Sequence, residues 1–337
     1  MSIVAAWENV SPQRFSEEIL PRNEPAVLRG LVCDWPAVWH GQRGGGAIAA
    51  YLAGLATQAP IGYVRAGSEI AGRLHYTADM RGLNFDRAMA PLPAFLEALL
   101  DVADVASPPA LAAQGLSVPH CLPGFVAENT CPLLPVTVSP RAWIGNRIEV
   151  ATHNDPAENI ACVVAGRRRF TLFAPDQISN LYIGPLHFTP AGTPISMVHV
   201  NAPDFQRYPR FATAMANSMT ADLVPGDALY IPYHWYHHVE SLDAVNVLIN
   251  YWWNPASGAG GSPWDALLHA IMSVRSLPAG QRRAWRAAFD HYAFLARGPA
   301  GAHLPAEVRG ILGADTPADL EQMRLALVQN LSGQPPR

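Results

Sequence analysis

The chain has 337 residues, half of them apolar, so it can bury a substantial core in one large domain or in one domain with an appendage. Its formal net charge is -4, and no basic run is longer than three residues. These features argue against a surface that follows nucleic-acid phosphates.

Membrane and export signals are also missing from the sequence. No stretch approaches the roughly 20 apolar residues of a membrane span, and residues 1–15 lack the basic and apolar segments of a signal peptide. We expect a cytoplasmic protein without membrane partners, in which the cysteines are reduced. The cysteines show no close metal-binding spacing, and they are Cys33, Cys121, Cys131 and Cys162.

The first part of the chain mixes helical and strand patterns. Ser11 predicts the start of a helix that continues to about Leu20, and residues 25–30 read as a strand. Helical spacing returns at residues 92–100. Residues 107–124 are rich in proline and alanine, and we expect a loop there.

Short strand patterns fill residues 137–254. The apolar run 161–164 and the alternating run 169–173 flank Gly166, which predicts a hairpin. The turn signal at 225–227 is followed by another short apolar strand, which Pro232 ends. Many short strands favour a mainly β fold, a double-stranded β-helix of the cupin jelly-roll type with flanking helices.

A long insertion interrupts these strands at residues 184–222. It has few apolar repeats, which is unusual in a compact domain and often functional. We expect it to lie over the mouth of a site.

Helical spacing dominates after residue 254. Small residues at 256–261 indicate a linker, and residues 262–265 read as a capping box with proline in the first turn. Thr316 predicts the start of a last helix. The sequence therefore predicts a domain at 1–257 and a C-terminal helical segment at 262–335.

Two segments carry the chemistry. One contains His153 and Asp155, and the other, residues 225–238 (PGDALYIPYHWYHH), ends in histidines. Side chains at i and i+2 share one face of a strand, so His153 and Asp155 can hold one ion. Two imidazoles and one carboxylate are the ligand set of a non-haem Fe(II) site with open positions. The alternative is a surface His–Asp pair, with the later histidines packed among aromatic rings.

The stretches WIGNRIEVATHNDPAENIACVVAGRRRFTLFAPDQ, PGDALYIPYHWYHHVESL and VNVLINYWW, read together, carry a family resemblance. They resemble the cupin-like branch of the JmjC family of Fe(II)/2-oxoglutarate oxygenases. That branch includes bacterial cupin-like proteins and the asparaginyl hydroxylase of hypoxia-inducible factor. The resemblance is dense over 143–253 and traceable back to about Pro25.

The resemblance implies His153, Asp155 and His237 as the metal ligands. In the family pattern the first histidine of the pair faces the iron, so His238 is expected to turn the other way. The resemblance implies no role for His234.

For the cosubstrate, the resemblance implies a cation at Arg168, where relatives usually carry lysine. This chain has no lysine, and all 23 basic residues are arginine. Alternation places Arg167 and Arg169 on the opposite face from Arg168, so we expect one of the three to point inward and two outward. A neighbouring arginine could take the role instead, and the alternative for all three is a solvated basic edge. A guanidinium can bind a carboxylate with two hydrogen bonds and stay charged when buried.

Three more positions match residues that contact 2-oxoglutarate in the family, namely Tyr76, Asn159 and Asn250. The chain departs from the family at Val150, where relatives often have threonine and where Thr152 could supply the hydroxyl. It also has Asn154 in place of an aromatic residue.

The implied function is that of an Fe(II)- and 2-oxoglutarate-dependent dioxygenase, a hydroxylase that releases succinate and CO2. We expect it to hydroxylate a protein or peptide side chain. A small-molecule hydroxylase and a non-catalytic metal- or ligand-binding cupin remain as alternatives. Because relatives dimerise through C-terminal helices, we expect a homodimer, with an intramolecular cap on the barrel as the alternative.

Overall fold

The computed structural model describes residues 1–190, 192–254, 260–313 and 316–332. The chain divides into two compact units, Met1–Asn254 and Pro255–Arg337. Among the described residues, no helix is both long and apolar enough to cross a membrane.

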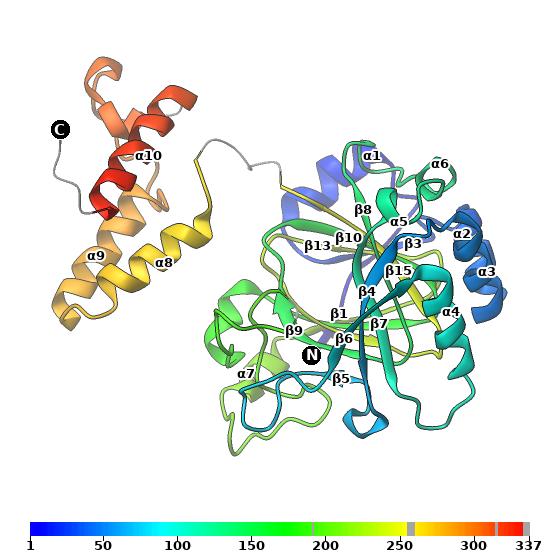
Figure 1. Cartoon of the computed structure of the whole chain (residues 1–337). Helices are drawn as coiled ribbons and strands as arrows, with labels where there is room; N and C mark the ends of the chain where they lie inside the picture. Colours follow the sequence, from blue (N-terminus) through cyan, green and yellow to red (C-terminus); the bar gives the residue numbers. More distant parts are fainter. Residues whose placement is uncertain (191, 255–259, 314–315, 333–337) are drawn as a thin grey trace. The chain divides into compact units, whose positions relative to one another are not determined.

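Two β-sheets form the centre of the first unit (Figure 1). In spatial order, the smaller sheet contains β1 (Ser2–Ile3), β12 (Met219–Leu223), β11 (Arg168–Phe173), β14 (Tyr236–Ser241), β9 (Glu149–Asn154) and β5 (Arg73–Leu74). The larger sheet contains β2 (Ala6–Glu8), β3 (Ala26–Arg29), β13 (Ala228–Ile231), β10 (Glu158–Ala165), β15 (Asn246–Trp253), β8 (Pro140–Gly145), β7 (Ala110–Ser117), β4 (Pro60–Ala66) and β6 (Asp86–Pro91). The predicted mainly β jelly roll is confirmed.

Helices and helical turns flank these sheets, and α3 packs against both α2 and α4 (Figure 1). They are α1 (Pro12–Arg14), η1 (Phe15–Ile19), η2 (Leu20–Arg22), α2 (Pro36–Gln42), α3 (Gly45–Leu55), η3 (Ser68–Ile70), α4 (Leu92–Asp101), α5 (Val118–Cys121), α6 (Phe125–Glu128), η4 (Pro175–Asn180) and α7 (Phe211–Ala216).

Alternation along β10 places its side chains in two different clusters of the hydrophobic core. Ile160 and Cys162 pack in the larger cluster, together with the helices that cover the nine-stranded sheet. Ala161 and Val163 pack in a second cluster with Phe170 and other residues of the facing sheet. The second cluster therefore lies between the sheets, in the interior where a jelly roll can hold a site.

Several expected elements are confirmed. The first helix begins after Ser11, whose side chain accepts a hydrogen bond from the Arg14 N–H (3.1 Å). The strand expected at 25–30 is β3, and the helix expected at 92–100 is α4. Gly166 has φ +71° and joins β10 to β11 in the predicted hairpin.

The prediction of a loop at 107–124 was wrong, because β7 and α5 occupy most of this range. The strand β7 is largely buried and pairs with β4 on one side and β8 on the other. This pairing outweighs the weak strand preference of alanine and glycine. Gly115, at φ +65°, lies in the register irregularity between Ala113 and Leu116.

The insertion at 184–222 covers the outer side of β14 and the adjoining edge of β9. Val198 and Phe211 pack in one cluster with Tyr236 of β14. The Ser196 N–H donates to the Thr152 carbonyl of β9 (2.7 Å). The segment then enters the smaller sheet as β12.

In the second unit, the regular elements that the structure describes are helices, and few of the described residues are buried. The helices are α8 (Pro263–Val274), α9 (Ala279–Tyr292), η5 (Ala306–Val308), η6 (Gly310–Gly313) and α10 (Pro317–Leu331). Thr316 caps α10 by accepting from the Asp319 N–H (3.3 Å), as expected. The side chain of Ser262 makes no capping bond, so that part of the capping-box prediction was wrong.

Among the described residues of this unit, only Ala300 and Gly301 are buried. Most of the linker predicted at 256–261 lies outside the described residues.

Candidate metal centre

Two neighbouring strands bring the candidate metal ligands together. His153 on β9 is paired in register with His237 on β14, and their ring centroids are 4.3 Å apart. Asp155 follows one residue beyond the end of β9, and its Oδ2 lies 3.6 Å from His237 Nε2. One ligand atom from each residue lies within 4.8 Å of the other two, so all three can reach one ion.

Each histidine is oriented by the backbone of its own strand. His153 Nδ1 lies 2.9 Å from the Ala151 carbonyl, and His237 Nδ1 lies 3.1 Å from the Trp235 carbonyl. A carbonyl oxygen can only accept, so each Nδ1 carries the proton. Each Nε2 is then left with a lone pair for a metal.

The protonation state of His237 suits a ligand. Burial, with a smaller contribution from nearby His153, lowers the pKa of His237 to about 4, although the Asp155 carboxylate opposes the shift. The imidazole is therefore neutral at pH 7, which is the form that binds metals.

A register shift in β9 shapes this part of the site. His237 pairs with His153, but Val239 pairs with Val150, which leaves Ala151 and Thr152 opposite His238. Val150 and His153 are three residues apart and both line the central cavity, which regular alternation would not allow.

The ligands line a narrow cavity of about 50 Å³ between the two sheets. Residues of both sheets form its wall, namely Trp143, Val150, His153, Asp155, Asn159, Ala161, Arg168, Phe170, His237, Val239, Leu248, Asn250 and Trp252. None of the described residues of the 184–222 insertion is among them. The expectation that this insertion lies over the mouth of the site therefore stays a prediction.

Arg168 lines the same cavity and is 4% exposed. Its Nη2 donates a long hydrogen bond (3.4 Å) to the Trp143 carbonyl, and its Nε has no partner among the described residues. Burial lowers its pKa to about 10, so the side chain remains charged at pH 7. A buried cation without a counterion is costly, which makes this end of the cavity attractive to an anion.

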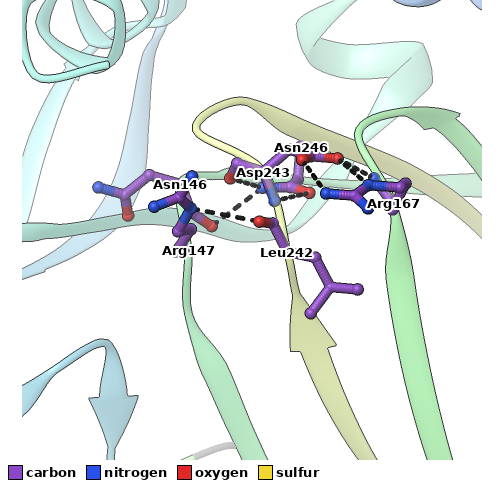
Figure 2. A network of polar contacts seen from close by, with 6 residues as sticks. All are labelled: Asn146, Arg147, Arg167, Leu242, Asp243 and Asn246. Atoms are coloured by element: carbon purple, nitrogen blue, oxygen red, sulfur yellow. Dashed lines mark hydrogen bonds and ion pairs between the residues drawn. The ribbon is translucent and has the colours of Figure 1, made fainter. Parts of the chain in front are cut away.

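The two neighbouring arginines point outward, as alternation predicted. Arg167 pairs with both carboxylate oxygens of Asp243 (Nε–Oδ2 3.1 Å, Nη2–Oδ1 2.8 Å) in the connection between β14 and β15, next to Asn246 (Figure 2). Arg169 forms a similar pair with Asp222 (2.7 and 3.2 Å). Of the three, only Arg168 is directed into the cavity.

Two asparagines form a hydrogen-bonded chain on the opposite wall. Trp143 Nε1 donates to Asn250 Oδ1 (2.9 Å), and Asn250 Nδ2 donates to Asn159 Oδ1 (3.4 Å). This leaves the Asn159 amide as a further polar group in the cavity wall. Buried amides in such apolar strands need partners of this kind.

Comparison with known proteins agrees with this geometry. The model of the cupin-like domain family matches residues 12–259. The chain belongs to this family. The cupin-like fold and the triad of two histidines and one aspartate together support membership of the Fe(II)/2-oxoglutarate oxygenases.

Individual relatives carry JmjC names or the name of a partner protein. The chain is 36% identical to "Lysine-specific demethylase JMJ31" of Arabidopsis thaliana over 103 residues, which are 31% of this chain and 18% of that protein. It is 38% identical to "HSPB1-associated protein 1" of Homo sapiens over 94 residues (28% and 19%). It is 27% identical to "Jumonji C domain-containing protein 5" of Drosophila melanogaster over 245 residues (72% and 58%). The chain thus spans about a fifth of the first two relatives.

One predicted cosubstrate residue of this cupin-like chain lies elsewhere. Tyr76 does not line the cavity, and its hydroxyl donates to the Phe188 carbonyl (2.6 Å). Its ring packs with Ala151 and Ile195 outside β9. Thr152, the possible substitute for the family threonine, is also absent from the cavity wall.

His238 turns away from the cavity, as predicted. It is 2% exposed, and neither ring nitrogen has a hydrogen-bond partner among the described residues. Sequence reasoning missed Trp143 and Trp252, although the alternation of 248, 250 and 252 along β15 could have indicated Trp252.

Proposed function

We propose that this cupin-like chain is an Fe(II)- and 2-oxoglutarate-dependent dioxygenase that hydroxylates a C–H bond. One observation carries the proposal: a two-histidine, one-carboxylate ligand set and a buried guanidinium without a counterion line a single cavity. A metal-chelating dicarboxylate such as 2-oxoglutarate would satisfy both groups at once.

In this proposal His153, Asp155 and His237 hold the iron. Three protein ligands leave coordination positions open, as a reaction centre requires. When bound, Fe(II) supplies the oxidising chemistry with O2, while 2-oxoglutarate is converted to succinate and CO2. The chain itself would keep both imidazoles in the Nδ1–H form and exclude bulk water with the apolar cavity wall.

Arg168 would bind the distal carboxylate of 2-oxoglutarate. Its planar guanidinium can form two parallel hydrogen bonds, and a dry surrounding strengthens them. Asn159 and Asn250 would flank the cosubstrate from the opposite wall. Tyr76 is left out of this set because its hydroxyl is already bound to Phe188.

A protein or peptide side chain is the substrate class we propose. It is supported by relatives whose names refer to demethylation of lysine, an amino-acid residue, or to association with a protein. Demethylation of an N-methyl group also begins with hydroxylation of a C–H bond, so release of formaldehyde would separate demethylase from stable hydroxylase chemistry.

We also propose a homodimer formed through residues 262–335. The support is that the described residues of this helical unit bury almost no core, and that Trp264, Leu268, Met272 and Trp285 are each at least 40% exposed. Exposed apolar surface of this extent indicates an interaction site.

Free thiols support a reducing compartment such as the cytoplasm. All four cysteines are free, including Cys131 and Cys162, whose side chains share a hydrogen bond in the core.

Turnover tests the catalytic proposal. Protein loaded with Fe(II) without oxygen is given 2-oxoglutarate and air, and succinate is measured beside the Asp155→Ala variant. We expect slow succinate formation without added substrate, which the variant abolishes. Absence of turnover together with absence of 2-oxoglutarate binding in calorimetry would reject the oxygenase in favour of a non-catalytic cupin.

A further inference from the structure

His234 has an unusual backbone conformation in the turn between β13 and β14. The turn closes with a hydrogen bond from the Trp235 N–H to the Pro232 carbonyl (3.1 Å), and His234 has φ +63°. Glycine or asparagine is usual at such a position. A bulkier L-residue in this region costs about 1 kcal/mol or more.

The strained residue makes two contacts with the end of β9. Its Nδ1 accepts a hydrogen bond from Asn154 Nδ2 (2.9 Å), and its backbone N–H donates to the Asp155 carbonyl (3.2 Å). Asn154 and Asp155 are consecutive, so the two bonds form a closed ring between the turn and the strand end. Both Asn154 and His234 are half-buried.

Asp155 needs such support because of its place in the chain. It lies one residue beyond β9, and the strand pairing with β14 ends at Asn154. Within the described part of the chain, the His234 N–H is the backbone donor to the Asp155 carbonyl. The sheet ladder fixes His153 and His237, whereas the turn fixes the carboxylate-bearing residue.

We propose that the Asn154–His234 pair is a positioning device that holds Asp155 in place for the metal. This inference rests on the proposed metal site and adds residues that do not touch the ion. In the left-handed (αL) conformation, the His234 backbone directs its N–H to the Asp155 carbonyl while its ring accepts from Asn154. Partners that orient a metal ligand typically change metal affinity 10- to 100-fold when removed.

The substitution His234→Gly distinguishes an effect on the position of Asp155 from an effect on the stability of the fold. Glycine relieves the αL strain and removes the ring, so metal-free thermal stability should be unchanged or higher. We expect Co²⁺ affinity, measured by calorimetry on the full chain, to fall about 10-fold. The visible bands of bound Co²⁺ should also shift, because they report ligand geometry.

Two further variants serve as controls. Met80→Gly relieves the same αL strain (φ +60°) at an exposed position outside the cavity wall, and should leave Co²⁺ affinity and spectrum unchanged. Asn154→Ala should weaken Co²⁺ binding as His234→Gly does, and the double variant should be no weaker than either single variant, since the two residues act as a pair.

Three outcomes would overturn the inference. Wild-type Co²⁺ affinity and spectrum in His234→Gly would leave the ring without a positioning role. Additive losses in the double variant would show that the residues act separately. A wild-type chain that binds no Co²⁺ would reject the proposed metal site as well, whereas the first two outcomes leave that site intact.

Discussion

The guanidinium of Arg168 is buried in the cavity wall, where we propose that it binds the distal carboxylate of 2-oxoglutarate. We expect Arg168→Met to weaken 2-oxoglutarate binding about 100-fold, which corresponds to losing roughly 3 kcal/mol of charge-assisted hydrogen bonding. Without ligand, the variant should be as stable as wild type or more stable, because a desolvated charge has been removed. Calorimetry with Mn²⁺-loaded protein and denaturant unfolding measure the two effects.

Arg169→Met is the matched control for this prediction. Arg169 is the next residue on the same strand, but it is exposed and paired with Asp222. Its removal should leave 2-oxoglutarate affinity within about twofold of wild type, since surface ion pairs contribute little. Equal losses in both variants would contradict the assignment of Arg168.

The lowered pKa values of three buried histidines predict how the free energy of unfolding depends on pH. Burial lowers the pKa values of His75, His237 and His238 to about 4 each, below the ordinary value of 6.5. Between pH 4 and 6.5 the unfolded chain therefore binds more protons than the folded chain. The free energy of unfolding of the metal-free protein should therefore reach its full value above pH 6.5 and fall as the pH is lowered below it. Each such histidine should contribute up to about 1.4 kcal/mol per pH unit to this fall.

His238→Leu should flatten this pH dependence by the contribution of one histidine. It should not destabilise the protein at pH 7.5, since a buried imidazole without partners among the described residues is replaced by an apolar group. Thr171→Val, at the cross-strand neighbour of His238, is the non-titrating control. An unchanged pH slope in His238→Leu would contradict the prediction. Chemical unfolding with chelator present, from pH 5 to 8, gives the slopes.

At the level of elements, the β10–β11 hairpin carries Arg168 and depends on Gly166. A Cβ on Gly166 would lie 2.3 Å from Asn246 Oδ1 and 2.7 Å from the Val245 carbonyl. Together with its positive φ, this predicts that Gly166→Ala lowers the free energy of unfolding by more than about 2 kcal/mol.

The control Gly30→Ala separates the cost of backbone strain at positive φ from the cost of a steric clash of the new Cβ. Gly30 also has a positive φ (+64°), but a Cβ there would meet nothing within 4 Å. Its substitution should cost about 1 kcal/mol, the backbone part alone. Similar costs for both variants in denaturant titrations would show that the Asn246 contact is not limiting.

The same elements show what could be predicted from sequence. The candidate metal ligands could be predicted because His153 and Asp155 have strand spacing, and because the family resemblance implied His237 just beyond a strand with clear end signals. The outward direction of Arg167 and Arg169 followed from alternation. The strand β7 was missed because its alanines fit a sheet only when neighbours on both sides pair with it.

Other parts of the site depend on tertiary contacts that the sequence does not display. The register shift opposite His238 brings Val150 and His153 to one face, and no local pattern marks it. Tyr76 was expected in the cavity, but its position depends on Phe188, which is 112 residues away in the chain.

At the scale of the whole molecule, the proposed homodimer predicts a particular mass in solution. Sedimentation or light scattering should give twice the chain mass of 36.4 kDa. Met272→Glu places a charge on a side chain that is 65% exposed in α8, and should shift the protein toward monomer. The control Ser273→Glu, at the adjacent exposed position, should remain dimeric. A wild-type monomer at all concentrations would favour the intramolecular cap.

The oxygenase assignment is tested most directly by isotope labelling. The Fe(II)-loaded chain is incubated with 2-oxoglutarate under ¹⁸O₂, and the succinate is analysed by mass spectrometry. A 2-oxoglutarate-dependent dioxygenase places one atom of O₂ in succinate, so we predict singly labelled succinate from wild type and none from Asp155→Ala. Unlabelled succinate, or 2-oxoglutarate that is never consumed, would contradict the account.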